Sequence, residues 1–137
     1  IAAGPGAVWV AANLQQTVSE IDPRTGALVK TISLQNAPDA IAADDSGAWV
    51  LNSAGGTVTT IDATGTVVGN PIRVGANPSA IVTGAGAVWV ANQGDDTIMR
   101  IDPATREVTK TIPVGGPPVA LGVTTSGTVW VLLGLEA

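Results

Sequence analysis

Four tryptophans recur at a nearly constant spacing, and this period restricts the possible folds more than any other feature of the chain. Trp9, Trp49 and Trp89 are 40 residues apart, and Trp130 follows after 41. Each lies in a short apolar string, of which "GAVWVAN" at 86–92 is the fullest version. A fixed period of about 20–50 residues is typical of stacked repeat architectures. The spacing predicts units at 1–40, 41–80 and 81–120, and half a unit at 121–137.

Each unit contains four short segments that are typical of β-strands. In the third unit they are 80–84, 87–92, 97–102 and 107–114, and Gly, Pro, Asn or Asp bounds them. The connections are short enough for hairpins, which predicts an antiparallel meander, with strands A to D, in every unit. Four such strands every 40 residues indicate a β-propeller blade. We therefore expect an all-β propeller fragment with three complete four-stranded blades and half of a fourth.

The composition supports this fold and predicts how the blades pack. Apolar residues make up 45% of the chain, while 17 Gly and nine Pro can supply its turns. The strand at 87–92 is apolar on both faces, so its sheet has to lie between two others. We expect Trp49 and Trp89 to be buried between blades. We expect Trp9 and Trp130 to be more exposed, because their blades are terminal.

The repeat resembles a known family. The strings "WVLN" at 49–52 and "WVAN" at 89–92 are similar to the YVTN motif of YVTN-family, NHL-like β-propeller repeats, with Trp in place of Tyr. The flanking sequences at 17–32 and 97–120 are similar to that family too. The resemblance covers essentially the whole chain, although Ala12 replaces the motif Asn in the first unit. It implies a propeller fold and, since family members include surface, secreted and bacterial sensor proteins, an extracytoplasmic location.

Acidic residues recur in the turns, where a structural role is expected. Asp22, Asp62 and Asp102 each open a turn such as "DPRTG", in which the Asp side chain caps backbone N–H groups. The pairs at 44–45 and 95–96 do not have the alternation of a calcium loop. We interpret them as solvated turns, with a weak cation site as the alternative.

Charge and residue inventory exclude several classes of function. The net charge is −5 and the six Lys and Arg residues are scattered, which disfavours nucleic acid and anionic membranes as partners. The chain has no His and no Cys, so it offers no Ser–His–Asp triad, no thiol nucleophile and no common zinc ligand. No catalytic residue, metal or cofactor is predicted.

A binding surface is the remaining functional hypothesis. If strand A is innermost, the D–A and B–C loops share one end of the propeller, where polar loop residues can bind a ligand. Non-catalytic binding, sensing or scaffolding of an unknown protein or small molecule is the preferred interpretation. The alternative is part of a propeller enzyme, a lyase or lactonase similar to virginiamycin B lyase, with its catalytic residues in other blades. The predicted ligand-binding residues are Asn36, Asp39, Asn52, Asn77, Ser79, Asn92, Asp95 and Asp96.

The ends of the chain carry a prediction about closure. The chain begins at Ile1 rather than Met, so we expect a piece of a longer protein whose other blades are its partners. The last half-blade needs strands C and D that the first unit cannot give. We expect an open arc with an unpaired edge at 127–132 and uncovered apolar faces on both terminal blades. In the parent, these two strands should lie upstream of residue 1, with Ala137 near the natural end.

Overall fold

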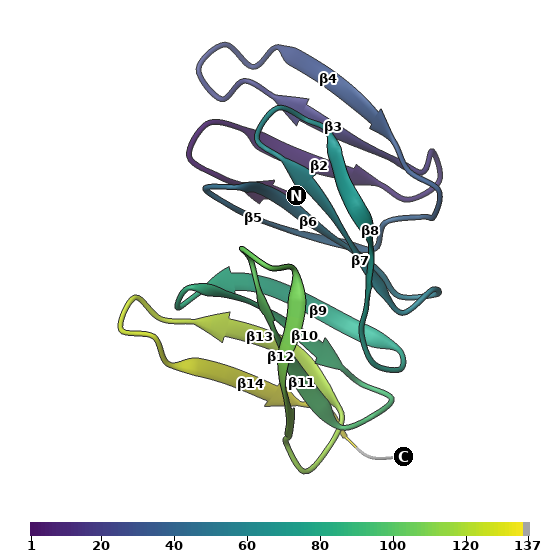
Figure 1. Cartoon of the computed structure of the whole chain (residues 1–137), viewed down its shortest axis with the longest axis vertical. Helices are drawn as coiled ribbons and strands as arrows, with labels where there is room; N and C mark the ends of the chain where they lie inside the picture. The colour runs from purple at the N-terminus through teal and green to yellow at the C-terminus, as the bar shows by residue number, and fades with distance from the viewer. Residues whose placement is uncertain (136–137) are drawn as a thin grey trace.

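The computed structural model describes residues 1–135, and these residues form fourteen β-strands and no helix (Figure 1). Consequently, no helix in this part of the chain is long and apolar enough to cross a membrane. The strands build three four-stranded antiparallel sheets and one two-stranded sheet. The predicted all-β propeller fragment, with three blades and half of a fourth, is confirmed. The end of the predicted half-blade, 136–137, lies outside the described residues.

The four blades follow one another in chain order. Blade 1 consists of β1 (Ala2–Ala3), β2 (Val8–Ala12), β3 (Thr17–Ile21) and β4 (Leu28–Ser33). Blade 2 consists of β5 (Ala40–Asp44), β6 (Gly47–Asn52), β7 (Thr57–Asp62) and β8 (Val67–Arg73). Blade 3 consists of β9 (Pro78–Gly84), β10 (Ala87–Asn92), β11 (Thr97–Asp102) and β12 (Glu107–Pro113). Blade 4 consists of β13 (Pro118–Val123) and β14 (Val129–Leu133).

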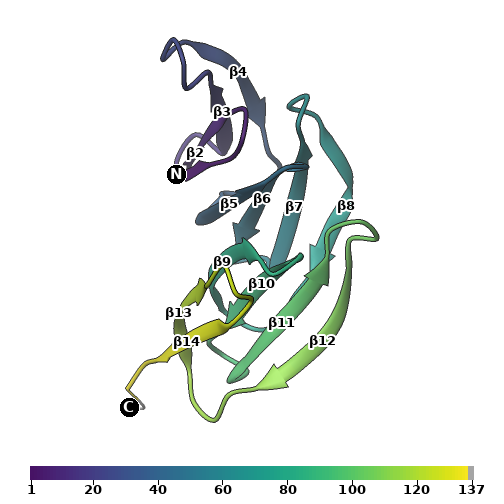
Figure 2. The same ribbon diagram turned by 90° about the vertical axis from the view of Figure 1, so that its left-hand side faces the viewer.

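The first strand of each blade lies on the inner side of an open arc. β5 contacts β9, and β9 in turn contacts β13. Figure 2 shows these strands towards the concave side, with β8 and β12 on the convex side. The outer edge of β14 has no paired strand among the described residues, which confirms the predicted open edge. Strand A is therefore innermost. In every blade the A–B turn lies at one end of the strands and the B–C turn at the other end.

Each blade has two different apolar faces, and they pack in a fixed direction. In β6, Ala48 and Val50 join the core shared with blade 1, whereas Trp49 and Leu51 join the core shared with blade 3. We call the side with the tryptophan the Trp face and the opposite side the Ile/Val face. The Trp face of blade 1 packs on the Ile/Val face of blade 2, and this order repeats between blades 2 and 3.

The predicted exposure of the four tryptophans is only partly correct, and the packing direction explains the differences. Trp49 is 0% exposed and Trp130 is 66% exposed, as expected. Trp9 is only 2% exposed, so its predicted exposure was wrong, because the first blade lacks a neighbour only on its Ile/Val face. Trp89 is half-buried rather than buried, since blade 4 covers it with two strands instead of four. Arg100 lies over the Trp89 ring, 5.9 Å from its centroid.

The recurring Asp residues cap the C–D turns, which confirms their predicted structural role. Asp22 Oδ1 accepts a hydrogen bond from the Arg24 amide at 2.8 Å, and Asp102 Oδ1 accepts one from the Ala104 amide at 2.8 Å. Asp62 Oδ1 accepts bonds from the Thr64 hydroxyl at 2.6 Å and from two backbone amides. The Thr64 hydroxyl bond, followed by the backbone bonds, lowers the pKa of Asp62 from its usual 3.8.

Candidate functional site

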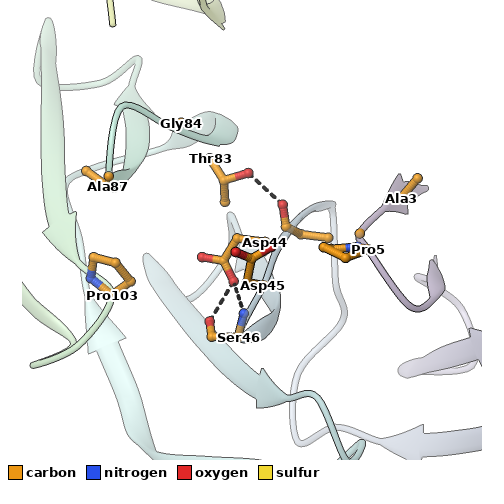
Figure 3. A pocket seen from close by; sticks show the side chains of 12 residues that line it. Ala3, Pro5, Asp44, Asp45, Ser46, Thr83, Gly84, Ala87 and Pro103 are labelled. Carbon is orange, nitrogen blue, oxygen red and sulfur yellow. Dashed lines mark hydrogen bonds between the residues drawn. The ribbon is translucent and has the colours of Figure 1, made fainter. Parts of the chain in front are cut away.

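A cavity of about 580 Å³ opens where the A–B turns of neighbouring blades meet, at one end of the strands (Figure 3). Blade 1 contributes the turn after β1, blade 2 the turn after β5, and blade 3 the turn after β9. Three consecutive blades therefore share this cavity. Its lining consists of Ala3, Gly4, Pro5, Ala43, Asp44, Asp45, Ser46, Thr83, Gly84, Gly86, Ala87 and Pro103.

The local sequence explains why the walls of this cavity are short turns. Gly, Pro, Asp and Ser dominate the three A–B connections, and each favours a reversal of the chain. Ala85 and Gly86 have φ values of 52° and 72°, in the left-handed region that glycine adopts without cost. Gly86, which lines the cavity, therefore allows the tight reversal that keeps this wall short.

Both carboxylate oxygens of Asp44 accept hydrogen bonds within the site. Its Oδ1 accepts a hydrogen bond from the Ser46 amide at 2.9 Å, and the Ser46 hydroxyl donates to the same oxygen. Its Oδ2 accepts a bond from Trp49 Nε1 at 3.0 Å. Because Trp49 is fully buried between blades 2 and 3, this bond ties the turn to the core. The carboxylate of Asp44 is therefore a positioned part of the wall.

Asp45 is the exposed acid of the site. Figure 3 shows the Asp45 side chain beside that of Asp44, and Asp45 is exposed to solvent. A smaller cavity of about 100 Å³ adjoins the first and adds Glu20 and Trp9 to the shared lining of Pro5, Asp44 and Asp45. The lining residues of the two cavities include no Lys, Arg or His. The charged side chains that line the two cavities are thus all carboxylates, which accept hydrogen bonds and suit a cationic or donor-rich group.

Thr83 connects two blades at the cavity wall. Its hydroxyl donates a hydrogen bond of 2.6 Å to the carbonyl oxygen of Ala43 in blade 2 (Figure 3). Gly84 follows, and a Cβ there would come within 2.7 Å of a Val123 methyl carbon in blade 4. Blades 2, 3 and 4 are therefore in close contact at these positions, and the Thr83 bond fixes the part of the cavity wall that blades 2 and 3 share.

The loop residues that the sequence predicted as ligand-binding lie at the opposite end of the strands, with the B–C turns. Two of them bind the connection between blades 2 and 3. The amide of Gly75 donates to Asn92 Oδ1 at 3.1 Å, and the amide of Ala76 donates to Asp95 Oδ2 at 2.8 Å. Both side chains belong to blade 3, while Gly75 and Ala76 lie in the connection from β8 to β9. Asn92 is 0% exposed, and its amide group also donates to Thr97 at 3.3 Å. Asn92 and Asp95 therefore fix the connection between blades 2 and 3.

Asp39 and Ser79 make further connections between neighbouring blades. Asp39 Oδ1 accepts a bond from Asn13 of blade 1 at 3.2 Å, and Oδ2 accepts one from the Ser53 amide at 2.7 Å. The Ser79 hydroxyl donates to the Pro118 carbonyl of blade 4 at 2.7 Å. The equivalent carbonyls of Pro38 and Pro78 also accept a side-chain bond from the preceding blade, from Asn13 and from Ser53.

The other predicted residues are distributed over separate places. Asn52 is buried, and its Oδ1 caps the B–C turn by accepting from the Gly55 amide at 2.7 Å. Asn36 lines a cavity of about 310 Å³ beside β8, whereas Asn77 lines a different one of about 330 Å³. Asp96 is exposed, with a φ of 55°. The structure does not bring the eight predicted residues into one pocket.

The sequence did not predict a binding site at the A–B cavity, although one local string indicated a possible site. The string "ADDSG" at 43–47 predicted the A–B turn and left a weak cation site open. The cavity itself forms where turns 40 residues apart meet, and no local pattern encodes that meeting.

The fold and the curved stacking of blades define the class of the protein, a β-propeller in the form of an open arc. No protein-family model matches the chain, and no curated protein matches it. Among solved structures, hydrazine synthase from Kuenenia stuttgartiensis is 21% identical, with a TM-score of 0.86 over 97% of this chain and 41% of that chain. A streptogramin B lyase is 22% identical, with a TM-score of 0.75 over 93% of this chain and 44% of the lyase.

A third propeller is BBS1N, solved in complex with ARL6DN. It is 20% identical, with a TM-score of 0.75 over 93% of this chain and 40% of that chain. The chain thus spans about two-fifths of each of these three structures. The likeness shows the fold, and these three propellers include two enzymes and one protein solved in complex with another.

Proposed function

We propose that the chain is a non-catalytic β-propeller binding module of the YVTN type, and that it binds a ligand or partner segment carrying a cationic, donor-rich group. The observation that carries the proposal is the open cavity of about 580 Å³, which three A–B turns line and which includes Asp44 and Asp45. A rigid scaffold that presents short loops is a common basis for binding. An extracytoplasmic location is part of the proposal and rests on the family resemblance.

The charges of the site support this class of ligand. Asp45 is exposed, Asp44 is fixed by bonds to Ser46 and Trp49, and no basic side chain lines the cavity. An ammonium or guanidinium group can donate to a carboxylate and to backbone carbonyls at once, and hydrogen bonds to charged groups are worth about 1.5–3 kcal/mol. A net charge of −5 attracts the same class of ligand over longer range.

A titration of the isotope-labelled chain with N-acetyl-arginine amide, followed by NMR, tests the proposal. We expect the amide signals of Asp45, Ser46 and Gly86 to shift. Asp45→Asn should weaken binding about tenfold, which corresponds to about 1.4 kcal/mol. Asp96→Asn is the matched control, because Asp96 is another exposed carboxylate and lies in a B–C turn at the opposite end of the blades, and it should leave the affinity unchanged.

Two outcomes would contradict the proposed site. Signals that shift only around Asn36, Asn77 and Asp96, with a loss of affinity in Asp96→Asn, would favour the loop end predicted from the sequence. The absence of any saturable shift would exclude a cation-binding cavity altogether.

A further inference from the structure

A cavity of about 310 Å³ lies between blades 1 and 2, away from the A–B turns. Its walls come from the connection that follows β4 and from strands β7 and β8. Thr59 of β7 lies opposite Val50, which joins the core shared with blade 1. Because directly opposite residues share one face of a sheet, Thr59 lies on the face of blade 2 that is turned towards blade 1.

An irregularity in β8 shapes the wall of this cavity. Between two regular pairs of β7 and β8, the three residues 69–71 stand opposite Thr59 alone. In blades 1 and 3, the outermost strand has a single extra residue at its register shift. Extra residues of this kind bend a strand and turn its side chains away from the regular ladder. This part of the wall is therefore particular to blade 2.

The polar side chains of the cavity are neutral and accessible. Gln35, Asn36 and Asn70 line it with three carboxamide groups, and all three residues are exposed. These carboxamides make no hydrogen bond to another residue of the described chain, whereas Asn52 and Asn92 use theirs to hold backbone amides. Among the described residues that line the cavity, none is charged. The three carboxamides therefore offer donors and acceptors to a ligand.

Comparison of the repeats indicates that the packing of the blades does not need these polar groups. Between blades 2 and 3, 40 residues later, other residue types stand at the equivalent positions, with Gly75 for Gln35, Ala76 for Asn36 and Met99 for Thr59. Thr59 and Met99 occupy equivalent places in their sheets, because each lies opposite the valine that follows the tryptophan of the preceding strand. The core between blades 2 and 3 forms all the same.

We propose that the cavity between blades 1 and 2 binds a neutral saccharide. Sugar hydroxyl groups both donate and accept hydrogen bonds, as do the carboxamides and the Thr59 hydroxyl group. Leu34, Val67 and Pro71 add apolar surface for the C–H groups of a sugar ring. The volume lies at the lower end of the range of about 300–1,000 Å³ that ligand pockets span, which fits a monosaccharide or disaccharide.

Two other classes of ligand are disfavoured at this cavity. A charged ligand would meet no countercharge among the lining residues. A peptide strand needs a regular free edge, but Pro71 of β8 has no N–H group to donate and Gly69 has a φ of 68°. The ligand also differs from the cationic group proposed for the A–B cavity, so the two sites can be tested separately.

A titration of the isotope-labelled chain with glucose, galactose, mannose, fucose and N-acetylglucosamine, followed by NMR, tests the proposal. With at least one of these sugars we expect saturable shifts of the side-chain NH₂ signals of Gln35, Asn36 and Asn70. The Kd should be about 1–10 mM, because each neutral hydrogen bond contributes little net free energy. Asn36→Ala should weaken binding about fivefold by removing one of these bonds.

Thr59→Met tests the cavity itself, because it introduces the residue that blade 3 has at the equivalent position. We expect binding to be lost while the circular dichroism spectrum stays unchanged. Gln15→Ala is the matched control, since it removes an exposed carboxamide in the B–C turn of blade 1, outside the cavity, and it should leave the affinity unchanged. Asp45→Asn should also leave sugar binding unchanged, so that failure of one site does not affect the test of the other.

Three outcomes would overturn the proposal. The first is the absence of a saturable shift with all five sugars. The second is unchanged affinity in Thr59→Met, or equal weakening by Gln15→Ala and Asn36→Ala, because binding would then occur elsewhere. The third is a saturable shift of the same NH₂ signals with an uncharged tetrapeptide of valine and threonine but with no sugar, which would assign the cavity to an added peptide strand.

Discussion

Truncation of Trp49 to alanine tests the packing between blades 2 and 3. A buried Trp removes about 150–250 Å² from water, and about 25 cal/mol per Å² gives roughly 4–6 kcal/mol for the whole side chain. Alanine keeps part of that area, and measured Trp→Ala changes in cores cost about 3–5 kcal/mol. Trp49 is 0% exposed and also donates to Asp44, so we expect Trp49→Ala to lower the free energy of unfolding by about 3–5 kcal/mol.

Urea denaturation followed by circular dichroism measures this loss. With a slope of about 2 kcal/mol per M, the midpoint should fall by roughly 2 M. Trp130→Ala is the matched control, because Trp130 is 66% exposed, and it should cost less than about 1 kcal/mol at a concentration where the chain is monomeric. Equal losses in the two variants would refute the burial of Trp49 between blades 2 and 3.

Three further predictions concern the turns and connections. Gly47→Ala should destabilise the chain by about 2–4 kcal/mol in the same assay, because its Cβ would collide with the Ile61 carbonyl oxygen. Gly6→Ala is the control and should be neutral, because a Cβ at Gly6 meets no atom within 4 Å. Asn92→Ala should cost about 1–3 kcal/mol by leaving the Gly75 amide unpaired, and an equal loss in the exposed Asn36→Ala would contradict this role. The carboxyl group of Asp62 should titrate by NMR with a pKa below 3.8. Its stabilising effect is therefore present above pH 3.8 and is lost as the pH falls through the lowered pKa. A pKa at or above 3.8 would contradict the capping.

The strands and the turn caps could be predicted from the sequence because they depend on residues close together in the chain. The predicted strands 87–92 and 97–102 coincide with β10 and β11. Asp22 and Asp102 cap their own turns through amides two residues away. Local pattern and turn chemistry are sufficient for features of this kind.

The packing of the blades could not be predicted in the same way. The burial of Trp9 depends on which face of β2 meets blade 2, and alternation alone does not say which of two apolar faces is covered. The use of Asn92 and Asp95 to clamp a linker depends on the path from β8 to β9. Both features arise from contacts between repeats rather than within them.

Solvent paramagnetic relaxation enhancement of the ring C–H protons tests the directional stacking of the propeller most directly, because it reports how exposed each of the four indole rings is. The measurement is made at a concentration where the chain is monomeric, and Trp→Phe substitutions assign the four sets of NMR signals. The structure predicts weak enhancement for Trp9 and Trp49, intermediate enhancement for Trp89 and strong enhancement for Trp130. Strong enhancement of Trp9 together with Trp130, with Trp49 and Trp89 equally protected, would show a symmetric stack and contradict the account.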